Sequence, residues 1–279
     1  MRRLNKSISL AFTFALVITA AIIPFASNAE ELRIGGSGTD LATIKQLAEK
    51  FTENKKNIKL IIPKSLGSSG GIKALRAGKL DIAITSRPLK QKEKSPHIRL
   101  FKYAQTALVF ATSANNPVDE INTQQLKDIY SGIHPYWPNG TVARPILRPP
   151  SDSDTILVRR YLPAMAEPMK LASKRRGVPT AYTDQKSASK IESVPGAIGT
   201  SALSLILAEE RPLKALNLNG IVPSIENITT GQYTMVKDLF IVIPSEPNEL
   251  VKNFIRFMNS KQSIEILNRT GHRVISFSL

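Results

Sequence analysis

Short apolar runs alternate with amphipathic segments along most of the chain, and this alternation is typical of βαβ units. Residues 32–34 are predicted as a strand, and a helix follows because the next apolar residues recur at helical spacing. Residues 58–62 form a second predicted strand and residues 80–84 a third, with a glycine-rich loop and a short helix at 67–77 between them. We therefore expect an α/β fold that begins with a largely parallel sheet.

The pattern also predicts two lobes connected by two crossings. An apolar run at 103–111 is followed by the turn-rich residues Asn115, Asn116 and Pro117, where the chain is expected to leave the first lobe. A strand at 239–243 is expected to bring it back. These crossings predict a first lobe of residues 30–112 and 240–279, a second lobe of residues 113–239, and a hinge near 112–117 and 236–244.

Several helices within these lobes have recognisable ends. Asn122 and Gln125 form a capping box at the start of one helix, and Gly132 ends it. A strand at 142–147 leads to a helix at 155–162 that Pro163 stops. Residues 250–268 form a last amphipathic segment whose apolar positions face a core.

The first residues have the pattern of a signal peptide, predicted to span residues 1–29. Three cations (Arg2, Arg3 and Lys6) precede an apolar stretch that reaches about residue 26, and small residues follow at 27–29. An uncleaved membrane anchor is the alternative, which Pro24 disfavours because it interrupts the apolar run. Since the chain has no cysteine, it lacks disulfides, thiolate metal ligands and a lipid-attachment residue. We expect a soluble periplasmic monomer that is not a lipoprotein.

The chain is strongly basic, with a net charge of +16 that falls to +13 if the three cations of the signal peptide are removed. Basic residues are scattered rather than gathered in a stripe interleaved with aromatic residues, and export makes nucleic acid an unexpected partner. Attraction of small anions or of an anionic envelope surface fits better. A role of the charge in solubility alone stays open.

Two Gly/Ser loops follow predicted strands and lead into helices. Helix N-termini carry unpaired amides and a partial positive charge, so they bind oxyanions readily, and hydroxyl groups add short-range donors. Since bound molecules in open α/β sheets lie at the carboxyl ends of strands, both loops are candidates for binding an anion. An ordinary helix cap is the alternative for each loop. The candidates are Ser37, Gly38, Thr39, Ser68, Ser69 and Gly70.

A third candidate segment begins at Arg148, whose planar guanidinium can grip two oxygens of an anion. It is followed by Asp152, Ser153, Asp154 and Thr155 at a helix start. The aspartates would repel a dianion unless the ligand carries a proton that they can accept, as hydrogen phosphate does and sulfate does not. Asp40 is a further possible acceptor. Each of these carboxylates could instead cap a helix, and Arg148 could simply pair with a neighbouring aspartate.

Ser86 and Arg87 follow the third predicted strand and add one more hydroxyl and one more guanidinium. Arg87 either faces the cleft or lies in solvent. No catalytic pattern accompanies these residues. His97, His134 and His272 are far apart in sequence, and the chain contains neither a GxSxG motif nor a P-loop. We expect no enzymatic activity, no catalytic residues, no metal and no cofactor.

The order of these motifs resembles the PstS-like family of periplasmic phosphate-binding proteins over nearly all of the mature chain. The resembling segments are residues 36–39, 67–73, 81–89, 116–118, 126–132 with Trp137, and 195–199. This resemblance implies a two-lobed type II periplasmic binding protein fold with the ligand in the interlobe cleft. It also implies inorganic phosphate or a related oxyanion as ligand and a membrane ABC permease as partner.

The resemblance carries over to single residues with two departures. Thr39, Ser68 and Arg148 match ligand-binding positions of the family. The family's Ser-Gly-Thr appears here as Ser153-Asp154-Thr155, and Arg87 stands where some phosphate binders have an aspartate. We expect a periplasmic solute-binding protein that captures phosphate for an ABC importer. Two alternatives stay open: the same scaffold binding another anion or a small organic acid, and an envelope protein used in signalling or interaction rather than transport.

Overall fold

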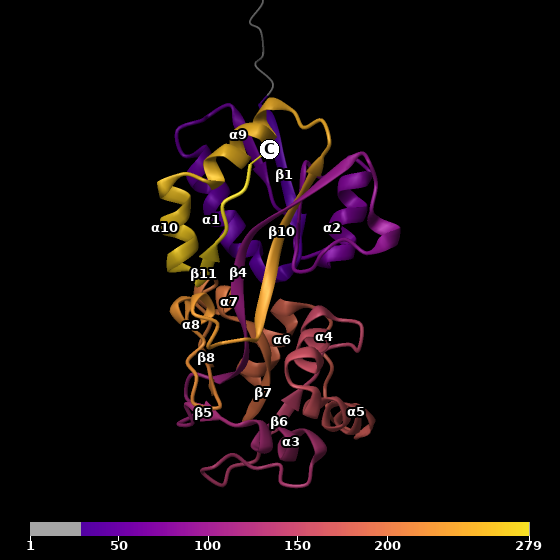
Figure 1. The fold of residues 1–279 in the computed structure, drawn as a ribbon, viewed down its shortest axis with the longest axis vertical. Helices are drawn as coiled ribbons and strands as arrows, with labels where there is room; N and C mark the ends of the chain where they lie inside the picture. Colours follow the sequence, from indigo (N-terminus) through magenta and orange to yellow (C-terminus); the bar gives the residue numbers. More distant parts are fainter. Residues whose placement is uncertain (1–28, 279) are drawn as a thin grey trace, which may run out of the picture.

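Two lobes, one above the other, form an elongated molecule in the computed structural model, which describes residues 29–278 (Figure 1). Two long strands, β4 (Ile98–Ser113) and β10 (Val236–Pro244), extend from one lobe into the other. The predicted signal peptide, apart from Ala29, lies outside the described residues. Within residues 29–278 no helix is both long enough and apolar enough to cross a bilayer.

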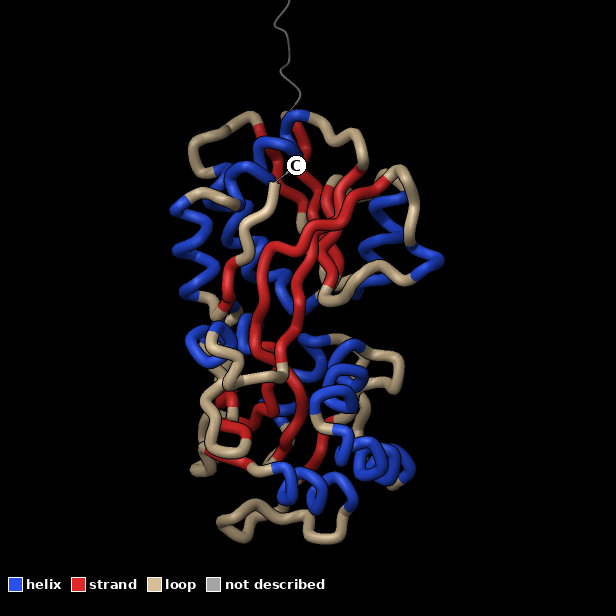
Figure 2. Tube along the Cα trace, viewed as in Figure 1, coloured by secondary structure: helices blue, strands red, loops and turns tan. Residues whose placement is uncertain are grey.

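A single mixed sheet of nine strands continues through both lobes of the described chain (Figure 2). The order of its main strands is β2-β1-β3-β10-β4-β7-β6, and β8 and β11 both pair with β4. The expectation of a largely parallel sheet is wrong for the central strands, where β10 runs antiparallel to both β3 and β4. The reason is that the chain leaves the first lobe on β4 and returns in the opposite direction on β10. The remaining strands are β1 (Glu30–Gly36), β2 (Ile58–Ile61), β3 (Ile82–Thr85), β6 (Arg144–Ile146), β7 (Ala197–Ala202), β8 (Leu213–Ala215) and β11 (His272–Val274), with β5 (Glu120–Ile121) and β9 (Asn217–Leu218) in a separate pair.

Strand β4 changes its partner where the lobes meet. It pairs with β10 up to Ala107 and with β7 from Leu108 onward, without a break in the strand. The chain returns at Val236, the partner of Ala107. The lobe boundaries expected at residues 112 and 239 lie on the same two strands, a few residues beyond this exchange. The division of the chain into lobes stays a prediction, and we propose that its hinge crosses β4 and β10 near this exchange.

The first lobe contains β1 to β3, the outer half of β10 and helices on both faces of the sheet. Ile82, Ile84 and Ile241 face one core with α1 and α9, whereas Ala83 and Val242 face α2 on the other side, as the two-residue period of a strand requires. The four helices of this lobe are α1 (Leu41–Thr52), α2 (Gly67–Arg76), α9 (Glu249–Met258) and α10 (Lys261–Arg269).

The C-terminal amphipathic segment, expected as one element over 250–268, is two helices. The first ends at Met258, and Ser260 caps the second by accepting a hydrogen bond from the backbone N–H of Ser263. Five polar residues separate Met258 from Ile264, so the apolar pattern is itself interrupted at the break. A serine before a new run of helical positions was the available signal.

The second lobe packs its helices around the inner half of β4, with β6 and β7. Phe110 of β4 meets the ring of Tyr130 edge-on, with ring centroids 6.2 Å apart. The capping box of Asn122 and Gln125 is confirmed, and Gly132 ends that helix at a φ of 79°. The helices of this lobe are α3 (Thr123–Ser131), α4 (Ser153–Tyr161), α5 (Ala166–Lys174), α6 (Asp184–Ser193), α7 (Leu203–Ala208) and α8 (Ile225–Thr229). The short 3-10 helix η3 (Pro163–Met165) lies between α4 and α5, whereas η1 (Gly38–Asp40) and η2 (Gln91–Glu93) lie in the first-lobe part of the chain.

Two glycines bring the start of α2 against the end of β1. Gly36 has a φ of 140°, a conformation that side chains disfavour, and a Cβ there would lie 2.2 Å from the carbonyl oxygen of Ile84. A Cβ on Gly71 would lie 2.7 Å from the Cα of Gly36. Both positions therefore need a bare backbone, and this contact holds the serine-bearing start of α2 beside the carboxyl end of the sheet.

Replacing Gly71 by alanine should destabilise the first lobe. The new methyl group would meet backbone rather than a movable side chain, so the helix must shift, at a cost of about 1 to 3 kcal/mol. Urea unfolding followed by circular dichroism would measure the loss. The matched control is Lys73→Ala, at an exposed position of the same helix. Equal stability of the two variants would contradict the close approach.

Candidate functional site

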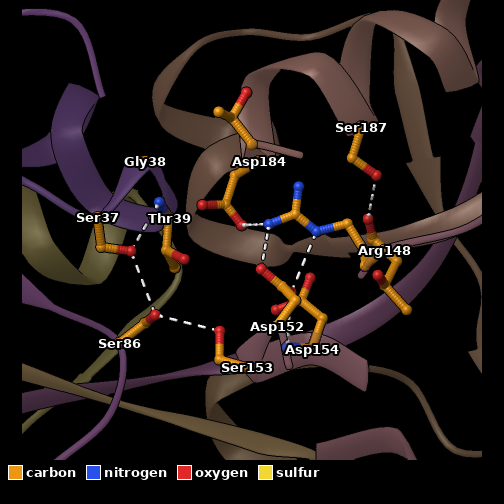
Figure 3. A network of polar contacts seen from close by, with 12 residues as sticks. Ser37, Gly38, Thr39, Ser86, Arg148, Asp152, Ser153, Asp154, Asp184 and Ser187 are labelled. Atoms are coloured by element: carbon orange, nitrogen blue, oxygen red, sulfur yellow. Dashed lines mark hydrogen bonds and ion pairs between the residues drawn. The ribbon is translucent and has the colours of Figure 1, made fainter. Parts of the chain in front are cut away.

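Four serine hydroxyls from four separate segments converge where the lobes meet, and Figure 3 labels three of them, Ser37, Ser86 and Ser153. Ser86 Oγ, just after β3, lies at their centre. It accepts a hydrogen bond from Ser37 Oγ at 3.2 Å and lies 3.5 Å from Ser68 Oγ of α2 and 3.4 Å from Ser153 Oγ of α4. The backbone N–H of Ser86 also donates to Ser68 Oγ. The cluster therefore joins the first lobe to the second through hydroxyls alone.

Arg148 lies beside this cluster, after β6, with only 4% of its side chain exposed. Its guanidinium holds Asp152 with two hydrogen bonds, from Nε at 3.1 Å and from Nη2 at 2.7 Å. Nη1 donates to the carbonyl of Ala181, and Nη2 reaches Asp184 at 3.5 Å. Burial lowers the pKa of Arg148, but the surrounding carboxylates outweigh burial and raise it above its ordinary value. The guanidinium is a permanent cation at the site.

Asp152 is the carboxylate that borders the cleft. It caps α4 by accepting the backbone N–H of Asp154 while it also holds Arg148. Burial and the negative charge of Asp154 raise its pKa, and the charge of Arg148 opposes them. The alternatives considered from the sequence, capping a helix and pairing with Arg148, are thus both realised by this one side chain.

A second buried cation, Lys237, was not anticipated from the sequence. Its ammonium group lies 2.5 Å from Asp154 Oδ1, 2.8 Å from Thr39 Oγ1 and 3.7 Å from Asp184 Oδ1, and its side chain has no exposed surface. The expected strand began at residue 239, two residues too late to include it. Lys237 lies on the same face of β10 as Leu239 and Ile241, which are both buried in the core. A lysine at a core-facing position of a strand was the signal that could have revealed it.

Asp40, considered above as an acceptor for the ligand, faces away from the cleft. Its carboxylate accepts a hydrogen bond from the hydroxyl of Tyr103, and its other oxygen lies 2.6 Å from His272 Nε2, inside the first lobe. His272 is completely buried there. Burial, together with the charge of Asp40, raises the pKa of Tyr103 well above its ordinary value, so the phenol stays protonated. These three side chains fix the start of α1 directly behind Thr39.

Arg87 belongs to a small ionic cluster at the edge of the site. It donates to both carboxylate oxygens of Glu93, each at 2.7 Å, and to Ser69 Oγ at 2.8 Å. Ser69 in turn donates to Glu93. The hydrogen bond from Arg87 lowers the pKa of Glu93 to about 2, although burial opposes this shift. The positive charge of Arg87 is therefore balanced by a residue that the sequence did not identify.

A cleft of about 270 Å³ lies over the serine cluster. Leu66 to Gly70 with Arg87 and Lys90 line its first-lobe side, and Pro149, Ser151 to Ser153 and Tyr182 line the side of the second lobe. Ser69 and Gly70 thus border the cleft. Gly38, Thr39, Asp154 and Thr155 are buried and do not line the cleft. Gly38 offers its carbonyl to Gln185, and Thr155 donates to the carbonyl of Arg148.

Hydroxyl donors, a helix start and a buried guanidinium in one place form a site suited to an oxyanion. No three histidine, cysteine or carboxylate side chains gather as a metal site anywhere in residues 29–278. The second lobe supplies Arg148 and Ser153, and the first lobe supplies the other three serine hydroxyls. A ligand in the cleft, which both lobes line, would contact both lobes.

Comparison with known proteins identifies the class. A PBP (periplasmic binding protein) superfamily domain matches residues 24–262, and the chain therefore belongs to this superfamily. Protein SphX of Synechococcus elongatus is 27% identical over 248 residues, which cover 80% of this chain and 71% of that protein. Phosphate-binding protein PstS of Staphylococcus saprophyticus is 32% identical over 123 residues, which span 39% of this chain and only 38% of the relative.

Solved structures confirm the type II binding-protein fold. A Clostridium perfringens protein, described as a phosphate ABC transporter substrate-binding protein with phosphate bound, matches with a TM-score of 0.74 and 23% identity, over 88% of this chain and all of that one. An ABC-type phosphate transport receptor from Vibrio cholerae matches with a TM-score of 0.59 and 21% identity, over 87% of this chain and 99% of that chain. At these identities the likeness is one of fold.

The Arg87–Glu93 pair should give the stability of the protein a defined pH dependence. Because the pKa of Glu93 in the folded protein is about 2, below its ordinary 4.5, its stabilisation is complete above pH 4.5 and is lost as the pH falls toward 2. Glu93→Gln should therefore lower the free energy of unfolding by roughly 1 to 3 kcal/mol at pH 7, and this gap should shrink in acid.

Urea unfolding at a series of pH values would measure the gap. Glu49→Gln is the matched control, because Glu49 pairs with Lys45 at 3.7 Å with both side chains more than half exposed, and such pairs contribute less than about 1 kcal/mol. A gap for Glu93→Gln that stays constant down to pH 2 would contradict the assigned pairing.

Proposed function

We propose that this protein captures inorganic phosphate between its lobes and delivers it to the membrane permease of an ABC importer. The observation that carries the proposal is the convergence of Ser37, Ser68 and Ser86 of the first lobe with Ser153 of the second, beside Arg148. Hydroxyls contributed by both lobes can surround a small tetrahedral anion, so that closing the lobes and binding the ligand become one event.

Arg148 retains donor capacity for such a ligand. Its contacts with Asp152, Asp184 and Ala181 account for four hydrogen bonds within the described chain, and a guanidinium has five N–H groups. One N–H is therefore left for an oxygen of the anion. A charge-assisted hydrogen bond of this kind is among the stronger contacts available in a protein.

Asp152 is the best-placed acceptor for the proton of hydrogen phosphate. Asp40 is engaged inside the first lobe, and Asp154 is buried against Lys237, whereas Asp152 borders the cleft. A carboxylate oxygen has two lone pairs, so Asp152 can hold Arg148 and still accept one more hydrogen. Sulfate has no proton to offer at neutral pH, and this contact would favour phosphate over sulfate.

The transport role is supported by the superfamily and by the relatives, which are named as phosphate-binding proteins and components of phosphate ABC transporters. The signal-peptide pattern supports a location outside the cytoplasmic membrane. One observation favours another oxyanion as a second candidate. The Arg87–Glu93 pair stands beside the cleft where some phosphate binders have a single acceptor carboxylate.

Titration calorimetry on protein freed of ligand by unfolding and refolding should show phosphate binding. Arg148→Ala should weaken it by about 2 kcal/mol or more, the scale of a lost charge-assisted contact. Arg148→Lys keeps the charge without the planar fork and should bind phosphate with intermediate affinity.

Arg144→Ala is the control, since Arg144 is an exposed arginine of the strand that leads to Arg148 and should leave phosphate affinity unchanged. A panel of sulfate, arsenate, molybdate and small carboxylates, read as shifts of the melting temperature, would rank other ligands. Refolded wild-type protein that binds one of these anions but not phosphate would refute phosphate as the ligand.

A further inference from the structure

Lys237 and Asp154 form a completely buried ion pair directly behind the proposed anion site. Lys237 lies on β10, one of the two strands that connect the lobes, and its ammonium group touches the first lobe at Thr39 and the second lobe at Asp154. Side-chain exposure is 0% for Lys237 and 1% for Asp154. Neither residue borders the cleft, so the pair acts on a ligand only through its charge and its neighbours.

The hydrogen-bond polarity of this pair determines what Thr39 can do. An ammonium group only donates, so Thr39 Oγ1 must act as the acceptor of its 2.8 Å contact with Lys237. The hydroxyl hydrogen of Thr39 is then available, because within residues 29–278 the hydroxyl accepts from Lys237 and donates no hydrogen bond. Lys237 thereby orients Thr39 as a donor, which is the polarity that an oxyanion requires.

The charges around the site explain why a second cation is needed. Asp152, Asp154 and Asp184 surround Arg148 and Lys237, so that three carboxylates face two cations. Burial lowers the pKa of Lys237, but Asp154 and Asp184 outweigh it and the pKa is raised; Asp154 has its pKa lowered by Lys237 and Arg148 in spite of burial. Both members of the pair are therefore charged. Without Lys237, one cation would face three carboxylates, and an arriving anion would be repelled.

We propose that Lys237 is a positioning residue that sets the anion affinity of the site, by neutralising Asp154 and by turning the hydroxyl of Thr39 into a donor. The inference rests on the proposed function. It accounts for the aspartate at position 154, which would otherwise place a negative charge at the helix start next to Ser153. The chain tolerates that aspartate because β10 supplies its counter-charge.

Two variants that break the same ion pair separate this role from a purely structural one. Lys237→Met removes the cation and should weaken phosphate binding roughly tenfold or more. Asp154→Asn removes the carboxylate and should bind phosphate at least as tightly as the wild type. Calorimetric titration with inorganic phosphate at fixed salt measures both affinities, and thermal unfolding of the same samples shows that each variant is folded.

The double variant keeps the test decisive if Lys237→Met alone fails to fold, because a neutral pair avoids an uncompensated buried carboxylate. Lys237→Met in the Asp154→Asn background should still bind phosphate roughly tenfold more weakly than Asp154→Asn alone, since it loses a cation and the orientation of Thr39. Equal affinities of these two proteins would overturn the proposal.

Lys102→Met is the matched control. Lys102 lies on the neighbouring strand β4 and pairs with Asp238 at 2.6 Å, with 33% of its side chain exposed, so its removal makes the same change in net charge outside the site. Its phosphate affinity should equal that of the wild type. Equal weakening by Lys237→Met and Asp154→Asn would show that the pair acts only through the fold. Absence of phosphate binding by the wild type would instead refute the proposed function, so the two failures are distinguishable.

Discussion

Buried charge at the junction of the lobes is the constraint on which the rest of the site depends. An ion removed from water costs several kcal/mol unless a partner and hydrogen bonds compensate it. Arg148 and Lys237 meet this requirement with Asp152, Asp154 and Asp184, which come from the starts of α4 and α6. Since Lys237 also holds Thr39, the ionic cluster fixes the position of the second lobe relative to the first lobe and to the strand that connects them.

The hydroxyl cluster depends on that arrangement and on the α/β architecture around it. Gly36 and Gly71 let the start of α2 approach the end of β1, which places Ser68 next to Ser86. Ser153 reaches the same point because Asp152 caps α4 with its first turn toward the cleft. Each hydroxyl is thus held at the end of a rigid element, so a ligand would find its donors already in place and would lose little of its binding free energy to their ordering.

Each departure from the family pattern is accompanied by a compensating charge. Arg87 is balanced by Glu93, whose carboxylate accepts two hydrogen bonds from it, and Asp154 is balanced by Lys237. Arg87 with Glu93 and Asp154 with Lys237 thus each form an ion pair without net charge close to the cleft. The partners come from η2 and β10, segments without any motif, and this explains why the motifs alone made both departures point to a ligand other than phosphate.

The sequence by itself determined the alternation of strands and helices, the two lobes as a hypothesis, the helix caps around Asn122 and Gly132, and all four serines of the cluster. These features depend on local chemistry, on periodicity and on the rule that strand ends gather at one edge of a sheet. Only the tertiary structure decided which charges meet. Asp40 turned inward to Tyr103 and His272, and Lys237 reached Thr39 from 198 residues away along the chain, because pairing between buried charges is set by three-dimensional packing and leaves no periodic signal in the sequence.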